Sequence, residues 1–100
     1  MNNLVLATFP AQAGKLETLK NLFREKLVET RAFEGCLSIE VYVQEDTETI
    51  HLVEDWESLA HYEKYLQWRL ETGLADLLEP ILEGGFEALK VMRCGQKEDI

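Results

Sequence analysis

The sequence predicts an α+β fold in which one antiparallel four-stranded sheet carries its helices on a single face. Three observations lead to this prediction. Some segments alternate in a period of two, others repeat apolar residues three and four positions apart, and Pro or Gly residues separate them. Along the chain these segments follow the order strand, helix, strand, strand, helix, strand, which is the split βαββαβ, or ferredoxin-like, arrangement.

The first half of the chain is expected to hold a strand and a long helix. Residues 4–9 are a short apolar run that Pro10 stops, because Pro lacks the N–H that a sheet ladder requires. Residues 13–30 show the spacing of an amphipathic helix, with a stripe formed by Leu16, Leu19, Phe23, Leu27 and Thr30. Gly35 ends the connection that follows the helix.

The middle of the chain predicts a hairpin. Residues 36–44 alternate, and the face expected to be apolar carries Leu37, Ile39, Val41 and Val43. The polar residues 45–48 form the turn. In the returning strand, residues 49–56, one face carries Ile50, Leu52, Glu54 and Trp56.

The second half predicts a helix, a shorter helix and a last strand. Ser58 is a favourable N-cap for a helix that runs to about Glu71. Gly73 ends that helix, a short helix is expected over residues 74–82, and residues 84–85 form a turn. The last strand is expected over residues 86–94. One domain therefore spans residues 3–94, and residues 95–100 form a polar C-terminal tail.

Helices on one face leave the other face of the predicted sheet without cover. That face carries either Val5, Ala7 and Phe9 or the alternate residues Leu4 and Leu6, together with Val53 and Leu89. An apolar face of this size usually contacts a partner. Two such sheets packed face to face give a homodimer of the dimeric α+β barrel type.

The composition narrows the classes of partner and compartment. The formal net charge of −9 in 100 residues disfavours nucleic acid and anionic membranes, which both require clustered Lys and Arg. Cys36 and Cys94 match neither a disulfide framework nor a zinc site. The N-terminus lacks a basic leader, and no apolar run approaches the roughly 18 residues of a membrane span. We therefore expect a cytoplasmic protein without a metal site.

One stretch is more specific than these general features. Arg31 precedes Gly35-Cys36, an alternating strand follows, and the next strand ends in Glu54-x-Trp56-x-Ser58. This combination resembles the antibiotic biosynthesis monooxygenase domain, a family of small dimeric α+β barrels, and the resemblance extends over residues 4–91. The family also contains haem-degrading enzymes and a signal-molecule isomerase.

Glu54 and Trp56 are the first candidate site residues. They lie two positions apart in a strand and therefore share one face. A Glu on an otherwise apolar face is costly unless it is paired or borders a wet cavity. Glu54 is thus either a base or substrate anchor, or the partner of Arg31 or Arg69 in a salt bridge. The resemblance implies that Trp56 lines a pocket between sheet and helices.

The second helix carries an unusual set of aromatic residues. Its expected sheet-facing side consists of Leu59, Tyr62, Leu66 and Leu70, and nearly the opposite side holds His61, Tyr65 and Trp68. The second side is expected to meet a pocket, the segment 74–82 or a partner subunit. Tyr65 and His61 are candidate proton-transfer groups, and Trp68 and Arg31 are candidate substrate-binding residues.

Haem degradation is not expected. The resembled family places a His nine or ten residues after the motif Trp, and its haem-degrading members use this His as the iron ligand with an Asn on the first strand. Tyr65 and Leu66 occupy the two helix positions here, and residues 4–9 contain no Asn. We therefore expect no cofactor.

The resemblance implies a cofactor-independent monooxygenase that oxidises a small aromatic phenol or quinol with O2. Such a reaction requires a dry cavity, a donor for the oxyanion and a proton acceptor. Two alternatives stay open. One is a non-catalytic dimer that binds a small aromatic or apolar molecule, and the other is an isomerase or tautomerase of a small carbonyl compound.

Overall fold

The computed structural model describes residues 2–100 and has the predicted βαββαβ order. The elements are β1 (Asn3–Pro10), α1 (Leu16–Ala32), β2 (Cys36–Val43), β3 (Thr49–Trp56), α2 (Leu59–Glu71), α3 (Leu74–Leu78), the short 3₁₀ helix η1 (Phe86–Ala88) and β4 (Lys90–Gly95). The ferredoxin-like α+β fold predicted from the sequence is therefore confirmed.

All strand pairs in the sheet are antiparallel, and the strand order is β2-β3-β1-β4. The two central strands, β1 and β3, pair along their full length, from Asn3 opposite Trp56 to Pro10 opposite Thr49. Because β3 lies between β1 and β2, Glu54 has Val5 on one side and Ile39 on the other. The sheet thus holds Glu54 at its centre.

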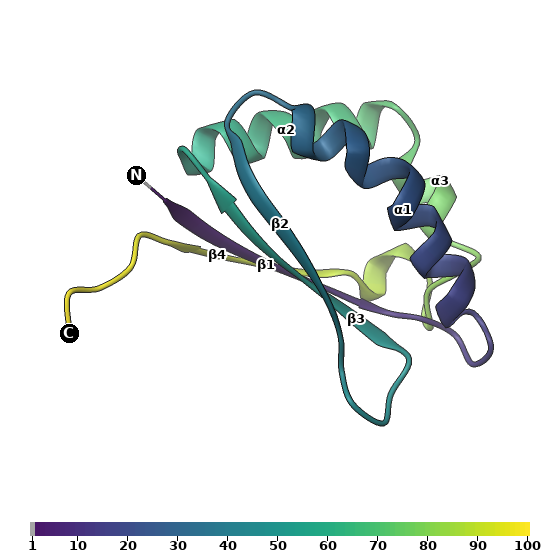
Figure 1. Ribbon diagram of the computed structural model, residues 1–100. Helices are drawn as coiled ribbons and strands as arrows, with labels where there is room; N and C mark the ends of the chain where they lie inside the picture. The colour runs from purple at the N-terminus through teal and green to yellow at the C-terminus, as the bar shows by residue number, and fades with distance from the viewer. Residues whose placement is uncertain (1) are drawn as a thin grey trace.

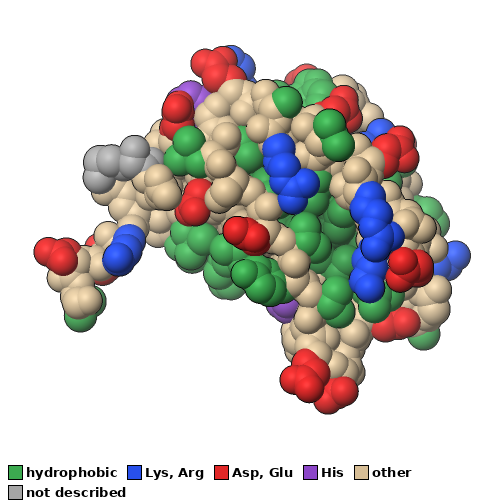
Figure 2. All heavy atoms as spheres, in the orientation of Figure 1, with side chains coloured by type: hydrophobic (Ala, Val, Ile, Leu, Met, Phe, Trp, Pro, Cys, Tyr) green, Lys and Arg blue, Asp and Glu red, His purple; other side chains and the backbone are tan. Residues whose placement is uncertain are grey.

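Figure 1 shows α1, α2 and α3 together on one face of the sheet. The side chains of β1 and β3 alternate strictly between the two faces, and those on the helix side are buried: Val5, Ala7, Phe9, Ile50, Leu52, Glu54 and Trp56. The face without helices carries Leu4, Leu6 and Val53, as one of the two predicted registers requires. Figure 2 shows hydrophobic side chains gathered below β4 and β1, away from the helices.

Several details of the elements differ from the expectations. A bulge between Cys36 and Ser38 removes Leu37 from the regular alternation of β2, and Leu37 is exposed. Helix α1 begins at Leu16, because residues 12–15 form a turn that precedes it. Helix α3 ends at Leu78, before Pro80, where the missing N–H disfavours a longer helix.

The last strand is also shorter than expected. Residues 86–88 form the 3₁₀ helix η1, and β4 begins only at Lys90. Leu89 consequently lies at the end of this helical turn and packs against the core, and the prediction that it belongs to the open sheet face is wrong. Met92, opposite Leu6 in the register, takes a place on that face and is 55% exposed.

The space between the sheet and the helices contains two clusters of buried side chains. The first, here called the apolar core, consists of hydrocarbon side chains only: Ala7, Phe9, Ala11, Leu19, Phe23, Leu27, Ile39, Ile50, Leu52, Leu78, Ile81 and Leu82. The second, here called the aromatic cluster, consists of Val5, Trp56 and Tyr62 with the partly buried Phe33, Cys36, Leu59, Tyr65, Leu66 and Val91 against them.

Candidate functional site

A cavity of about 270 Å³ lies between the sheet and the three helices, where the apolar core meets the aromatic cluster. The sheet contributes side chains from β1, β3 and β4, and most of the remaining wall is also apolar. The polar residues on its lining come from three elements: Lys26, Glu29 and Thr30 of α1, Glu54 of β3, and Tyr65 and Arg69 of α2 with Thr72 at the C-terminal end of that helix. A mostly apolar wall with a few polar groups is the form that small-molecule sites take.

Glu54 is the ionisable group on the sheet side of the cavity, and it is 4% exposed. Its Oε1 accepts a hydrogen bond from Trp56 Nε1 at 3.0 Å. Burial raises the pKa of Glu54 to about 7, against the opposing effect of the Trp56 N–H bond. Within residues 2–100 the carboxylate forms no ion pair, so the salt bridge with Arg31 or Arg69 that the sequence left open is not formed. Glu54 can therefore exchange a proton near neutral pH.

Trp56 supports this carboxyl from behind the cavity wall. It is fully buried, its ring packs against Tyr65 at 5.2 Å and Tyr62 at 5.6 Å between centroids, and it is not among the lining residues. The expectation that Trp56 itself lines the pocket is thus not met, because the strand end carries its indole under helix α2. Its indole N–H instead acts on Glu54.

Helix α2 is rotated relative to the prediction. Tyr62, Tyr65 and Arg69 face inward together, whereas Leu70 is 42% exposed. The prediction that Tyr65 lies opposite Tyr62 is wrong, since burial of Arg69 and Tyr65 brings their side of the helix to the cavity. Trp68 also lines the cavity.

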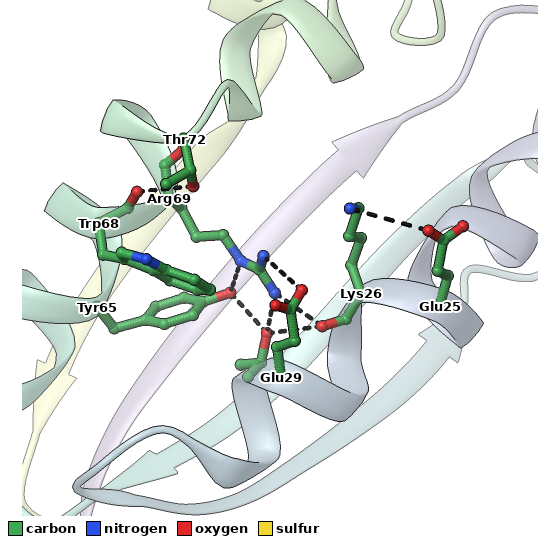
Figure 3. Close-up of polar contacts among 8 residues, drawn as sticks. Glu25, Lys26, Glu29, Tyr65, Trp68, Arg69 and Thr72 are labelled. Atoms are coloured by element: carbon green, nitrogen blue, oxygen red, sulfur yellow. Dashed lines mark hydrogen bonds and ion pairs between the residues drawn. The ribbon is translucent and has the colours of Figure 1, made fainter.

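Tyr65 belongs to a hydrogen-bonded cluster that joins α2 to α1 (Figure 3). Its hydroxyl lies 2.7 Å from Thr30 Oγ1 and accepts a bond from Arg69 Nε at 2.9 Å. Burial raises the pKa of Tyr65, although the bonds with Thr30 and Arg69 oppose the shift. The phenol therefore stays protonated at neutral pH and is available as a donor or a proton carrier.

Arg69 is a buried residue of the cavity wall that the sequence reasoning considered only as a possible salt-bridge partner. It is 7% exposed, and its guanidinium carbon lies 4.6 Å from the Trp68 ring centroid and 5.4 Å from that of Tyr65. The spacing of Tyr62, Tyr65 and Arg69 at three and four positions was the available signal. A charged residue next to aromatic residues in a helix is usually exposed, so the sequence did not indicate that Arg69 is buried.

The structure does not bring His61 or Arg31 to this cavity. The His61 ring lies against Gly35, where an added Cβ would be 2.4 Å from the ring, and its Nδ1 is 2.7 Å from Ser58 Oγ. Arg31 donates to the backbone oxygen of Ile39 and lies beside a separate surface hollow. Catalytic or binding roles for these two residues stay predictions from the sequence.

No group of three His, Cys, Asp or Glu side chains among residues 2–100 is arranged to hold a metal ion. None of the helices in this range is long and apolar enough to cross a membrane. The expectation that the first strand contains no Asn is not met, because β1 begins at Asn3, one residue before the predicted start. The Asn3 side-chain amide donates to the backbone oxygen of Glu57 at 3.0 Å.

Three solved structures illustrate the similarity in fold. A protein from Shewanella oneidensis aligns with a TM-score of 0.80 at 20% identity, covering 95% of this chain and 90% of its own. A protein from Deinococcus radiodurans, provisionally named an antibiotic biosynthesis monooxygenase, aligns with a TM-score of 0.79 at 22% identity, over 98% and 95% of the two chains. A Streptomyces coelicolor monooxygenase solved with nanaomycin D gives 0.71 at 22% identity, over 99% and 90%.

At these identities the structural similarity establishes the fold alone. None of the curated proteins matches the sequence. The sequence model of one family, described as antibiotic biosynthesis monooxygenase, matches residues 4–70. Because this match spans more than half of the chain, the protein belongs to the antibiotic biosynthesis monooxygenase family.

Proposed function

We propose that the protein is a cofactor-independent monooxygenase that oxidises a small aromatic phenol or quinol with O2 in this cavity. Membership of the family and the mostly apolar cavity both support the proposal. So does the Streptomyces coelicolor relative in fold, which was solved with the aromatic molecule nanaomycin D. The cavity volume of about 270 Å³ lies just below the usual range of ligand pockets, about 300–1,000 Å³, which suits a substrate with one or two rings.

The observation that carries the proposal is Glu54, a buried carboxyl on the cavity wall whose pKa burial raises to about 7. A general base works best when its pKa lies near the working pH. An ordinary carboxylate is too weak a base for a phenol, but burial in an apolar wall makes Glu54 a stronger one. Tyr65, held by Thr30 and Arg69, supplies an O–H donor on the opposite wall.

The reaction of a phenol illustrates the balance of atoms and electrons. Glu54 accepts the phenol proton, and the resulting phenolate carries electron density at the ring carbon opposite the oxygen. That carbon forms a bond with one oxygen atom of O2. The outer oxygen of the resulting peroxide takes up the proton that Glu54 held, and the freed Glu54 carboxylate then removes the hydrogen of that ring carbon as a proton. Cleavage of the O–O bond leaves a quinone carbonyl and releases hydroxide, which this second proton converts to water. One O2 is consumed per quinone, and the substrate supplies all four electrons.

Oxygen uptake with 1-naphthol as the probe tests the proposal. We expect consumption of one O2 per quinone, and ¹⁸O2 should place one labelled atom in the quinone and one in water. Glu54→Gln should lower the rate by about 10²–10⁴-fold, as for removal of a general base. The control is Glu71→Gln, because Glu71 is an exposed carboxylate at the end of α2 outside the cavity.

Two results would contradict parts of the proposal. Naphthol binding without O2 uptake would favour the alternative of a non-catalytic ligand-binding protein. Full activity in Glu54→Gln would show that this carboxyl is not the base.

We also infer that the protein forms a homodimer through the open sheet face. All three helices lie on the other face, and the open face exposes Met92 and Tyr42 beside Leu4, Leu6 and Val53. Contiguous apolar surface of this kind usually marks an interface. Sedimentation should give a dimer at micromolar concentration, and Leu6→Lys should convert it to a monomer. A stable monomeric wild-type protein would contradict the inference.

A further inference from the structure

Arg69 is a buried cation on the wall of the cavity, and it bridges a gap between two helices. It extends from α2 to α1, where Nη2 donates to the backbone oxygen of Lys26 at 2.7 Å and to Thr30 Oγ1 at 2.9 Å (Figure 3). Its Nε donates to Tyr65. A guanidinium has five N–H donors, and these three bonds go to neutral oxygens, which do not balance its charge.

The one carboxylate that pairs with Arg69 within residues 2–100 is that of Glu29. Its Oε1 lies 3.5 Å from Arg69 Nη1, at the limit of a hydrogen bond, and the Glu29 side chain is 55% exposed while that of Arg69 is 9% exposed. Burial of a cation is costly unless an anion compensates it closely. Arg69 therefore carries positive charge that its own chain compensates only weakly.

The surroundings of Nη1 show which kind of group can supply the missing charge. A carboxylate already approaches this nitrogen from Glu29, so a carboxylate fits there sterically. Because Glu29 is exposed, its side chain can move toward solvent and leave the position to another anion. Guanidinium groups also match planar carboxylates better than other cations do.

We propose that Arg69 binds the carboxylate of an aromatic acid, which replaces Glu29 at Nη1 while the ring system occupies the apolar cavity. This proposal rests on the proposed function and specifies its substrate class as a hydroxylated aromatic carboxylic acid. The aromatic rings of Tyr65 and Trp68 beside the guanidinium lie next to the ring system of the ligand. The acid group is then held between α1 and α2, and the reacting part of the ring points toward the sheet and Glu54.

The anion specificity is local, because the chain as a whole has a formal net charge of −9. That charge repels anions at long range, and salt screens this repulsion over about 10 Å at 0.1 M. A preference for an acid over its neutral amide therefore has to come from cations at the site, of which Arg69 is the buried one.

Calorimetric titration under nitrogen tests the proposal without any turnover. The probes are 2-naphthoate and 2-naphthamide, which share one ring system and differ in the charge of the substituent. We expect 2-naphthoate to bind the wild-type protein about tenfold or more tightly than 2-naphthamide, as a charge-assisted hydrogen bond provides. In Arg69→Met, which keeps much of the apolar stem, this preference should disappear.

A second variant guards against an Arg69→Met protein that fails to fold. Glu29→Gln removes the competing carboxylate and leaves Arg69 in place, so 2-naphthoate should bind roughly threefold more tightly and 2-naphthamide should bind unchanged. A purely structural Arg69 would not produce this gain. The matched control is Arg24→Met, because Arg24 is an exposed arginine of α1 that does not line the cavity.

Several results would overturn the proposal. They are equal affinity for the two probes in the wild-type protein, an unchanged preference in folded Arg69→Met, or no gain in Glu29→Gln. Failure of the proposed function would give a different result. The preference for 2-naphthoate over 2-naphthamide would remain, but neither 1-naphthol nor 1-hydroxy-2-naphthoic acid would cause O2 uptake.

Discussion

The apolar core and the aromatic cluster occupy the same face of one sheet, yet they differ in what their side chains can do. The apolar core contains hydrocarbon side chains only, so burial and packing account for its contribution. The aromatic cluster is placed around the Glu54 carboxyl, the Tyr65 hydroxyl and the Arg69 guanidinium, which are all buried or nearly so. Burial stabilises the first region, whereas in the second it raises pKa values and leaves a cation weakly compensated.

Trp56→Ala should have the largest effect, because Trp56 belongs to the aromatic cluster through both packing and hydrogen bonding. Truncation of a buried Trp typically costs about 3–5 kcal/mol in free energy of unfolding. It would also remove the Nε1 donor of Glu54. Urea denaturation measures the loss.

Trp56→Phe separates the two contributions of Trp56. It keeps most of the packing, but the Trp56 N–H that holds the pKa of Glu54 down is lost. The pH midpoint of turnover should therefore move upward. A midpoint that stays in place would assign Trp56 to packing alone.

Leu19→Ala makes the matching change in the apolar core. Leu19 is fully buried and does not line the cavity. We expect a loss of about 3 kcal/mol in free energy of unfolding, from lost burial and the cavity left behind, with turnover per folded molecule unchanged. Urea denaturation and O2 uptake below the unfolding transition measure the two quantities. A large loss of turnover would mean that the two regions are coupled.

The pH dependence of stability should distinguish the regions further. Burial raises the pKa of Glu54 from its ordinary 4.5 to about 7, so the folded state holds the proton more tightly than the unfolded state. Between these values the folded state binds more protons, and stability must fall as pH rises through this window. The free energy of unfolding should fall by about 3 kcal/mol in total, because each unit of pKa difference contributes roughly 1.4 kcal/mol.

The measurement is the free energy of unfolding of the wild-type protein minus that of Glu54→Gln at pH 5, 6, 7 and 8. Subtraction cancels the other titrating groups. A flat difference would show that burial does not raise the pKa of Glu54.

His61→Ala should have the smallest effect, since His61 lies outside both clusters and beside Gly35. The loss should be about 1 kcal/mol or less, the value of a net hydrogen bond with Ser58. Turnover in the O2 assay should stay within about twofold of the wild-type value. A loss above tenfold would instead support the catalytic role that the sequence suggested.

Local signals explain which parts of the fold the sequence predicted. Strand parity placed Glu54 and Trp56 on one face because side chains in a strand alternate strictly. Ser58 located the start of α2 because its hydroxyl accepts the backbone N–H of His61. The bulge that displaces Leu37 was not predictable from β2 alone, since it depends on pairing with β3.

The sequence by itself determined the order of the elements and the shared face of Glu54 and Trp56, because periodicity and caps depend on neighbours along the chain. Only the tertiary structure decided which side of α2 faces the cavity. The leucines and the aromatic residues of that helix form two adjacent stripes, so its pattern alone does not select which stripe faces inward. Arg69 can be buried because α1 presents the Lys26 backbone oxygen and Thr30 across the gap, and those partners lie about forty positions away in the chain.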